Sequence, residues 1–231
     1  MAKKERVIVL FITFAKPPFK ATMWTNFFDK IYLVNLAKRV DRLLESAEIL
    51  EKYQIPFQIF TATEDGVGAR GLRDTMNLLF DDALYNRYQN ILVFEDDVRM
   101  VEEPPIFNLI MDKAVSQLPP NYHLFYLGGQ PTGGYSYRYA TNLLPALKYF
   151  ATQSVAYSEQ GMKEIKGRGL GYPIDNWLVD EIQVLGHCFA VDPLLCSQRK
   201  GFSDIGQNEI DWNPFIVAKH QQKIAEMNSR T

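Results

Sequence analysis

The sequence predicts an α/β protein in which helices flank a mostly parallel central sheet. Between residues 31 and 88, apolar segments that end in polar residues alternate with segments of helical period, the order expected of successive βα units. Residues 91–94, Ile-Leu-Val-Phe, are apolar throughout, as expected of a central parallel strand that is buried on both faces. The 231 residues are 47% hydrophobic, enough for one substantial core, and they contain no internal repeat or linker. We therefore expect one domain over residues 1–231.

The first half of the chain predicts two βα units followed by a buried strand. Residues 41–53 and 72–88 carry apolar side chains at helical spacing. We expect Asp41 to cap the first helix, because a carboxylate oxygen accepts hydrogen bonds from free N–H groups of the first turn. The expected elements in order are strand 31–36, helix 41–53, strand 56–60, helix 72–88 and strand 91–94.

The second half predicts shorter elements around a loop rich in glycine and tyrosine. Residues 128–142 hold Tyr135, Tyr137 and Tyr139 among glycines, which suits either a lid or acceptor platform or a plain surface excursion. Ser158 is expected to cap the helix that follows it. The expected elements in order are helix 105–118, strand 123–127, strand 150–157, helix 158–166, helix 173–181, strand 186–191 and a C-terminal helix or tail over 213–227.

Charge and cysteine content limit the class of protein. Lys and Arg number 25 against 27 Asp and Glu, which gives a net charge of −2 and argues against a chain that mainly binds nucleic-acid backbones. Cys188 and Cys196 have no metal-binding spacing and suit a reducing compartment. The apolar run 7–15 is too short to span a membrane and lacks small cleavage-site residues after it, so we expect a strand there. We expect a cytoplasmic protein without a transmembrane segment, with peripheral membrane contact left open.

The strongest chemical signal is the run Glu95-Asp96-Asp97, directly after strand 91–94. In open α/β sheets, ligands bind beyond the carboxyl ends of the strands. Three adjacent carboxylates at that position repel one another unless a cation or hydrogen-bond donors meet them. Alternation along an extended chain places Glu95 and Asp97 on one side, where two hard oxygen ligands suit Mg²⁺ or Mn²⁺ bound to a diphosphate. The alternative is that the three acids only cap the next turn and face water.

Several segments resemble glycosyltransferase family 25, the group of lipooligosaccharide and collagen galactosyltransferases. Residues 31–42, Ile-Tyr-Leu-Val-Asn-Leu-Ala-Lys-Arg-Val-Asp-Arg, resemble its opening strand and loop, and residues 92–98, Leu-Val-Phe-Glu-Asp-Asp-Val, its metal-binding segment. The resemblance covers about residues 30–206 in the family's order, and residues 207–231 lie beyond it. One departure is Met76, where the family tends to carry an imidazole, so the donor sugar stays open. The other matches are Tyr126-Leu-Gly128, residues 152–165, Pro173-Ile-Asp175 and Ser203-Asp-Ile205.

The resemblance implies a GT-A type fold, a Rossmann-like domain that binds a nucleotide sugar. We expect a UDP-sugar as donor and Mn²⁺ or Mg²⁺ at the acidic turn, because a cation stabilises the charge that grows on the departing diphosphate. Arginine after the first strand suits a bidentate grip on phosphate, although Arg42 could instead be a solvated charge in a first helical turn. The candidates for nucleotide binding are Asn35, Arg39, Arg42, Glu95 and Asp96, and those for metal binding are Glu95 and Asp97.

Family 25 enzymes invert the anomeric configuration, so a carboxylate should accept the proton of the acceptor hydroxyl. Asp175 and Asp204 stand at matching positions and are the catalytic candidates. Asp175 could instead cap the helix that begins near Pro173, and Asp204 could only close a turn. The sequence does not separate the two.

Three acceptors and two other function classes stay open. The acceptor is expected to be a glycan such as lipopolysaccharide, with a protein side chain or a hydroxymethylated DNA base as alternatives, and the pI places the glycan ahead of the DNA. A non-catalytic nucleotide-sugar-binding protein would keep the fold without activity. A nucleotidyltransferase also uses paired acids on an α/β sheet.

Overall fold

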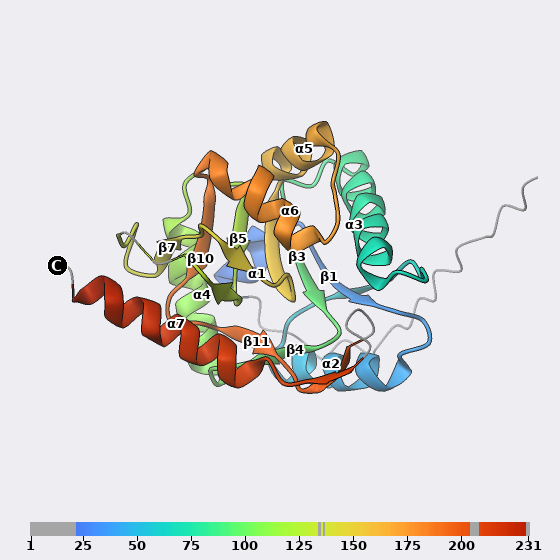
Figure 1. The fold of residues 1–231 in the computed structure, drawn as a ribbon, viewed down its shortest axis with the longest axis horizontal. Coiled ribbons are helices and arrows are strands. Elements are labelled where there is room, and N and C mark those ends of the chain that lie inside the picture. The colour runs from blue at the N-terminus through green and yellow to red at the C-terminus, as the bar shows by residue number, and fades with distance from the viewer. Residues whose placement is uncertain (1–21, 134, 136, 204–207, 230–231) are drawn as a thin grey trace, which may run out of the picture.

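The computed structural model describes residues 22–133, 135, 137–203 and 208–229. Its centre is a seven-stranded sheet in the order β2-β1-β3-β9-β5-β10-β7 (Figure 1). Strands β2, β1, β3, β5 and β10 run in one direction, and β9 and β7 run in the other, so the sheet is mostly parallel as predicted. The strands are β1 Lys30–Asn35, β2 Gln58–Thr61, β3 Asn90–Glu95, β5 Leu124–Tyr126, β7 Leu143–Pro145, β9 Ser154–Ser158 and β10 Cys188–Val191.

Helices cover both faces of the sheet and form two separate cores with it. In β1, Tyr32 and Val34 pack toward α3, α5 and α6, while Ile31 and Leu33 pack toward α1, α2 and α4. Burial on both faces explains why the central strands read as continuous apolar runs. The helices are α1 Met23–Phe27, α2 Val40–Lys52, α3 Gly68–Tyr85, α4 Pro104–Gln117, α5 Glu159–Arg168 and α6 Ile174–Glu181.

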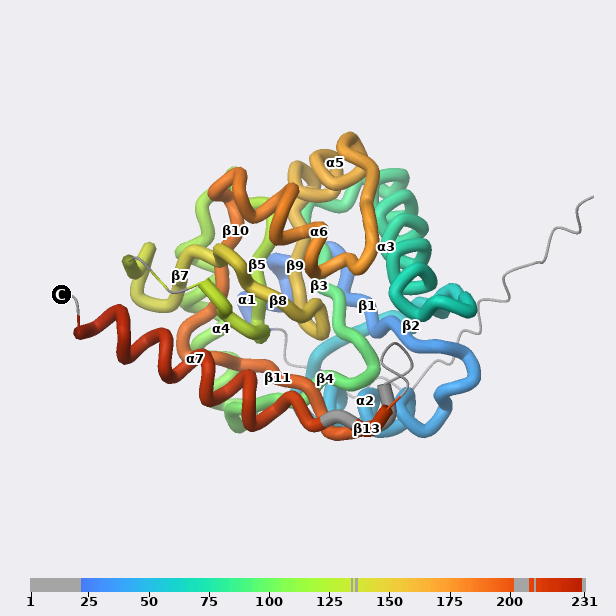
Figure 2. The backbone as a smooth tube through the Cα atoms, viewed as in Figure 1, coloured from blue at the N-terminus to red at the C-terminus, as the bar shows by residue number. Residues whose placement is uncertain are grey.

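Smaller elements line the lower edge of the sheet in Figure 1. The short strand β4 (Val98–Met100) follows the acidic turn and pairs with β11 (Cys196–Gln198), which brings residues about one hundred positions apart together. Helix α7 (Asn213–Asn228) packs along β6 (Gln130–Pro131) and β11. Figure 2 shows α7 beside β11. The remaining elements are β8 Tyr149–Phe150, which pairs with β6, the 3-10 turn Gln183–Leu185, and the pair β12 Gly201–Ser203 and β13 Asn208–Ile210.

Two expected helix caps have different outcomes. Ser158 caps α5 as predicted, because its hydroxyl oxygen accepts a hydrogen bond from the Gly161 N–H at 3.0 Å. The prediction for Asp41 is wrong, because α2 begins at Val40 with Arg39 at the capping position. Asp41 lies in the first turn and pairs with Arg39, whose hydrogen bond lowers the pKa of Asp41 to about 2.

The described residues of segment 128–142 include a short strand and a core residue, which neither interpretation of the sequence predicted. The segment contains β6, and Tyr135 is buried with its hydroxyl 3.2 Å from His220 Nδ1, so Tyr135 belongs to the core. Tyr137 and Tyr139 are exposed. The strand expected over 150–157 is divided between β8 and β9, and the C-terminal segment is a helix. The expected strand 7–15 lies outside the described residues. Among the described helices, none has both the length and the apolar character to cross a membrane.

Candidate functional site

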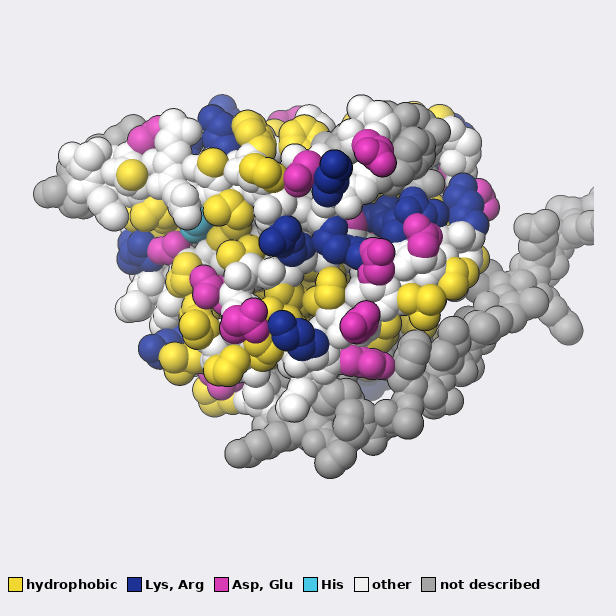
Figure 3. Space-filling model, turned by 90° about the horizontal axis from the view of Figure 1, so that it is seen from below, with side chains coloured by type: hydrophobic (Ala, Val, Ile, Leu, Met, Phe, Trp, Pro, Cys, Tyr) yellow, Lys and Arg dark blue, Asp and Glu magenta, His cyan; other side chains and the backbone are white. Residues whose placement is uncertain are grey.

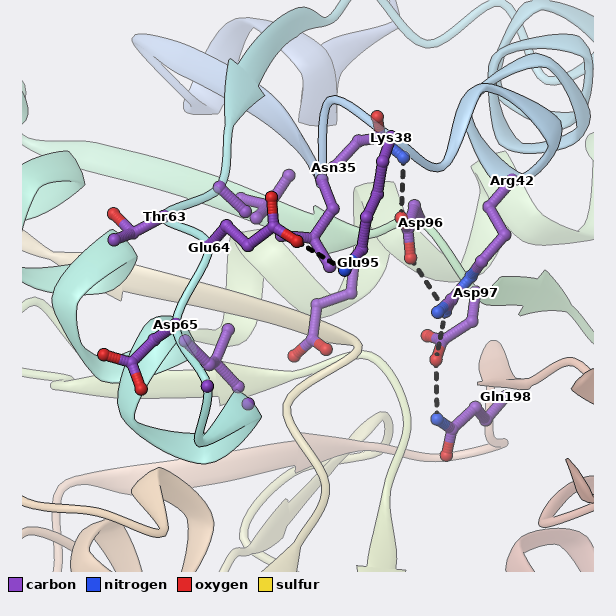
Figure 4. A pocket seen from close by; sticks show the side chains of 16 residues that line it. Asn35, Lys38, Arg42, Thr63, Glu64, Asp65, Glu95, Asp96, Asp97 and Gln198 are labelled. Carbon is purple, nitrogen blue, oxygen red and sulfur yellow. Dashed lines mark hydrogen bonds and ion pairs between the residues drawn. The ribbon is translucent and has the colours of Figure 1, made fainter. Parts of the chain in front are cut away.

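A pocket lies at the carboxyl ends of the parallel strands β1, β2 and β3, and we term it the strand-end pocket (Figure 4). Strand β1 lies between β2 and β3 in register, with Asn35 opposite Thr61 and Val34 opposite Glu95, so the three strand ends are neighbours. This is the edge at which open α/β folds bind ligands. Its charged lining residues are Lys38, Arg42, Glu64, Asp65, Glu95, Asp96 and Asp97.

Arg42 joins the two aspartates of the acidic turn. Strand β3 ends at Glu95, so Asp96 and Asp97 follow in a turn and the expected alternation of sides does not extend to them. Arg42 Nη2 lies 2.7 Å from Asp96 Oδ1 and 2.6 Å from Asp97 Oδ2. The Arg42 side chain is 15% exposed. Arg42 is therefore a largely buried counterion and not a solvated surface charge.

Asp96 is held by the protein from several sides. Asn35 Nδ2 donates to Asp96 Oδ2 at 2.7 Å and to the carbonyl oxygen of Arg39 at 3.0 Å, which ties the loop after β1 to the acidic turn. The backbone oxygen of Asp96 accepts from Ser46 Oγ at 2.7 Å and from the guanidinium of Arg199. Burial raises the pKa of Asp96 to about 6, although Arg42 opposes the shift. These hydrogen bonds give Asp96 a mainly structural role, which is to hold the acidic turn in place.

Glu95 and Asp97 differ from Asp96 in how their oxygens are used. Asp97 Oδ2 accepts from Gln198 Nε2 at 2.7 Å, while Asp97 Oδ1 is buried with no hydrogen-bond partner among the described residues. Glu95 Oε1 accepts from Thr152 Oγ1 at 2.7 Å, and in Figure 4 Glu95 stands apart from the group around Arg42. Burial and then the charge of Asp97 raise the pKa of Glu95 to about 8. Both carboxylates would be stabilised by an added cation.

The strand-end pocket fits a divalent cation that arrives with a diphosphate. It carries five carboxylates against Lys38 and Arg42, so a diphosphate alone would be repelled there. The buried, unpartnered Asp97 Oδ1 is an oxygen of the kind that Mg²⁺ and Mn²⁺ bind. The described residues contain no group of three or more His, Cys, Asp or Glu arranged to hold a metal. Asp97 would therefore be the protein ligand of such a metal, and phosphate oxygens and water would have to supply most of the other ligands, a mode typical of Mg²⁺.

A second pocket, the basic pocket, adjoins the first and shares Arg42, Asp97 and Gln198 with it. Arg39, Arg199 and Lys200 line it together with these residues. Three of its cations pair with carboxylates: Arg39 lies 2.9 Å from Asp41, Arg199 contacts Glu45, and Arg42 contacts Asp97. On the face shown in Figure 3, Lys and Arg side chains likewise lie beside Asp and Glu side chains. This pocket could receive phosphate oxygens that extend past Asp97.

A larger cavity of about 550 Å³ lies on the other side of Glu95, and we term it the α6 cavity. It shares Leu72, Glu95 and Gln198 with the strand-end pocket. Asp175, one of the two catalytic candidates, lines it from the first turn of α6. Asp175 does not take the N-cap position, which belongs to Pro173. The structure thus brings Asp175 to the same cavity as Glu95, whereas Asp204 lies outside the described residues.

Most of the site candidates from the sequence come together. Asn35, Arg42, Glu95, Asp96 and Asp97 line the strand-end pocket, Arg39 lines the basic pocket, and Asp175 lines the α6 cavity.

Sequence reasoning missed several residues of these pockets, among them Lys38, Thr152, Gln198 and Arg199. Lys38 Nζ lies 2.6 Å from Glu64 Oε1 across the mouth of the strand-end pocket (Figure 4). Gln198 and Arg199 reach Asp97 and Asp96 only because β11 pairs with β4. No local motif marks that pairing. Thr152 could have been considered, since it opens one of the segments that resemble family 25.

Comparisons with known proteins find structural likeness only. No family model matches the chain, and no curated protein matches it. It is similar to A197 from STIV (11% identity, TM-score 0.44, covering 78% of this chain and 92% of that chain). It is also similar to a glycosyltransferase involved in the glycosylation of the major capsid of PBCV-1, with 12% sequence identity and a TM-score of 0.47. That match covers 87% of this chain and 98% of that chain. A third similar structure is CMP:2-keto-3-deoxy-manno-octonic acid synthetase complexed with CTP, with 9% sequence identity and a TM-score of 0.39. That match covers 85% of this chain and 81% of that chain. At TM-scores below 0.5, no activity or substrate is transferred to this chain from these proteins.

Proposed function

We propose that the protein is a metal-dependent glycosyltransferase that moves a sugar from a UDP-sugar to an acceptor hydroxyl with inversion. The main support is the position of Glu95, the last residue of the central strand β3, and of Asp97 in the turn that follows. Both line a pocket in which carboxylates outnumber cations, so that a diphosphate would enter only with a cation. The proposed inversion of the anomeric configuration is supported by the segments that resemble the inverting family 25 enzymes, which occur in the same order as in that family. The acceptor is proposed to be a glycan such as lipopolysaccharide, and the buried free thiols of Cys188 and Cys196 are consistent with work in the cytoplasm.

In this proposal the strand-end pocket and the adjoining basic pocket hold the donor. The nucleoside diphosphate occupies the strand-end pocket, with Arg42 and the cations of the basic pocket near its phosphates. A divalent cation held by Asp97, with Glu95 assisting, would stabilise the negative charge of the departing diphosphate. Asn35 keeps the loop after β1 against the acidic turn and so fixes the shape of the pocket.

Asp175 acts as the general base in this scheme. The acceptor oxygen forms a bond to the anomeric carbon as the bond from that carbon to the diphosphate oxygen breaks, and the hydroxyl proton passes to the Asp175 carboxylate. Asp175 Oδ1 accepts from the Asn176 N–H at 2.9 Å, which orients the carboxylate. Asp175→Asn should lower kcat by about 10²- to 10⁴-fold, the usual contribution of such a group, and leave UDP binding unchanged.

Thermal unfolding with UDP and Mn²⁺ tests the donor site. A ligand that binds only the native state raises the apparent stability, so the wild type should gain in Tm with both ligands and gain less with either alone. Asp97→Ala should lose the gain, while Asp180→Ala, a change of an exposed carboxylate on α6 outside these pockets, should keep it. A wild type without any gain, or a full gain in Asp97→Ala, would refute the proposed metal and diphosphate site.

Product analysis separates the proposed reaction from its nearest alternative. Incubation with a panel of UDP-sugars and glycan acceptors should release UDP. Release of pyrophosphate from a nucleoside triphosphate and a sugar phosphate would instead identify a nucleotidyltransferase. UDP binding without turnover by either route would indicate a non-catalytic binding protein.

A further inference from the structure

The α6 cavity is placed to hold a second ligand against the first. It shares Glu95, Leu72 and Gln198 with the strand-end pocket, so ligands in the two spaces would meet beside Glu95. Its walls come from elements far apart in the sequence, including β6, the segment between β8 and β9, the start of α6 and the start of α7. Its volume of about 550 Å³ is within the range of small-molecule sites.

The charge of the α6 cavity selects against anions. Glu95 and Asp175 are its ionisable lining residues, and no Lys or Arg is among the described residues that line it. Arg199 and Lys200 line the basic pocket, which shares only Gln198 and Trp212 with the α6 cavity. A phosphate or carboxylate in the α6 cavity would therefore lose water without meeting a cation among these lining residues, and it would be repelled by Asp175.

Neutral hydrogen-bonding groups take the place of charges. Gln130, Thr132, Thr152 and Asn176 line the cavity with amides and hydroxyls. Gln153 also lines it and is 2% exposed, and neither of its amide atoms has a hydrogen-bond partner among the described residues. A buried amide without partners is destabilising. Hydroxyl groups both donate and accept, so a ligand rich in hydroxyls is suited to these side chains.

Apolar surface completes the cavity. Trp212, which is 40% exposed, and Phe150 present aromatic rings, and Leu72, Ile174 and Ile216 add aliphatic surface. A ligand that offers both hydroxyls and C–H faces matches a wall of this mixed kind, in which a few polar groups fix orientation on an apolar lining.

We infer that the α6 cavity is the acceptor site and that it takes an uncharged sugar residue, not a phosphorylated sugar or a nucleic acid. The inference rests on the proposed function, since it assigns the acceptor of the same reaction. The side-chain amides bind the hydroxyls of the acceptor sugar, Trp212 packs on its C–H face, and its reacting hydroxyl points to Asp175. A DNA acceptor would bring phosphates to a cavity whose ionisable groups are both acidic.

Acceptor competition tests the inference at saturating UDP-sugar and Mn²⁺. The panel contains uncharged alkyl glycosides of several hexoses and pentoses, the same glycosides bearing one phosphate, and a single-stranded oligonucleotide with hydroxymethylcytosine. The uncharged glycosides should have kcat/KM values at least tenfold above those of the charged acceptors. Equal or better use of a phosphorylated glycoside or the oligonucleotide would overturn the inference.

Two variants sharpen the result. Asn176→Lys adds a cation to the first turn of α6, where Asn176 is exposed, and should reduce the ratio of kcat/KM for uncharged over charged acceptors at least fivefold. Gln221→Lys is the control, because Gln221 is an exposed residue of α7 that lines another cavity, and it should leave this ratio unchanged. Gln153→Leu removes the unpartnered amide and should raise both the Tm and the KM for the acceptor. An unchanged preference in Asn176→Lys, or an unchanged acceptor KM in a folded Gln153→Leu, would contradict the assignment.

The UDP and Mn²⁺ thermal shift keeps the two proposals distinguishable. If the shift is absent in the wild type, the proposed function itself fails. If the shift is present and no uncharged glycoside is used, or a charged acceptor is preferred, only the acceptor assignment fails. The shift should be equal in Asn176→Lys, Gln153→Leu and the wild type.

Discussion

Arg42 is the residue on which the unliganded acidic turn depends. A single guanidinium nitrogen contacts both Asp96 and Asp97, and all three side chains are at most 16% exposed. Arg42→Ala would leave two close carboxylates without this counterion and should lower the free energy of unfolding by about 3 kcal/mol, as for other broken buried pairs. Mn²⁺ should restore part of this loss, because it supplies positive charge at the same carboxylates. Urea unfolding with and without Mn²⁺ measures both effects.

Arg168 provides the matched control for Arg42. Its ion pair with Glu164 lies on the surface of α5, with both side chains more than a third exposed. Arg168→Ala should cost less than about 1 kcal/mol and show no dependence on Mn²⁺. A loss in Arg42→Ala that Mn²⁺ does not reduce would count against a metal site at Asp97.

His123 should make the stability depend on pH. Its ring is 3% exposed, and burial, followed by the nearby His187, lowers the pKa of His123 below the usual 6.5. Below pH 6.5, His123 in the unfolded chain binds a proton that His123 in the folded protein does not bind. The free energy of unfolding therefore falls as the pH falls from 6.5 toward the pKa of His123 in the folded protein. His123→Leu should remove this loss, which is at most about 1.4 kcal/mol per pH unit.

The measurement for His123 compares urea unfolding at pH 7.5 and pH 5.5. The carboxyls of Glu95 and Asp96 are common to both proteins, so their titration cancels in the difference between wild type and variant. An equal loss of stability in both proteins would show that His123 does not bind the proton. The same cancellation applies to every other titrating group that the substitution leaves untouched.

At the scale of elements, the regular helices and strands were predictable because their signals are local. Apolar spacing over 41–53 and 72–88 identified α2 and α3, and the apolar run 91–94 identified β3. The start of α2 was missed, since a cap depends on one residue's backbone geometry and Arg39, not Asp41, takes that position. The sides taken by Asp96 and Asp97 were missed because alternation ends where β3 ends, at Glu95.

The N-terminus of α5 shows how one side chain joins two elements. The Ser158 hydroxyl accepts from the Gly161 N–H and donates to the backbone oxygen of Tyr122, just before β5. Ser158→Ala would remove the cap and leave that buried carbonyl without its donor, and should cost about 1–2 kcal/mol. Ser116→Ala, at an exposed hydroxyl near the end of α4, should lower the free energy of unfolding by only about 0.3 kcal/mol. Chemical denaturation of both variants measures the difference, and equal costs would refute the capping role.

At the scale of the whole molecule, the site is built from segments that no local pattern connects. Strand β11 brings Gln198 and Arg199 to the acidic turn, and α7 brings Trp212 and Ile216 to the α6 cavity. Sequence reasoning therefore found the residues that follow strands, such as Asn35 and the acidic turn itself. It missed those that depend on long-range pairing, because their spacing along the chain has no chemical meaning.

His220 is a buried residue of helix α7 that ties the helix to Asp192 and Tyr135. His220 Nε2 lies 3.0 Å from Asp192 Oδ1, and its Nδ1 lies 3.2 Å from the Tyr135 hydroxyl. Arg138 also pairs with Asp192 at 2.6 Å. Burial would raise the pKa of Asp192, but hydrogen bonds from His220 and Arg138 hold it below its usual value. This contribution to stability is present above about pH 4 and is lost as the pH falls through the lowered pKa.

His220→Ala should therefore loosen α7 and leave the strand-end pocket intact. We expect a cost of about 2 kcal/mol from the lost hydrogen bonds to Asp192 and Tyr135, with faster hydrogen exchange in α7 and unchanged exchange in β1 and β3. Because Trp212 and Ile216 belong to the α6 cavity, the acceptor KM should rise while the thermal shift with UDP and Mn²⁺ is kept. Gln221→Ala on an exposed part of α7 is the control. If His220→Ala reduced the UDP shift as much as acceptor use, the two cavities would not be independently supported, and the division of substrates between them would have to be abandoned.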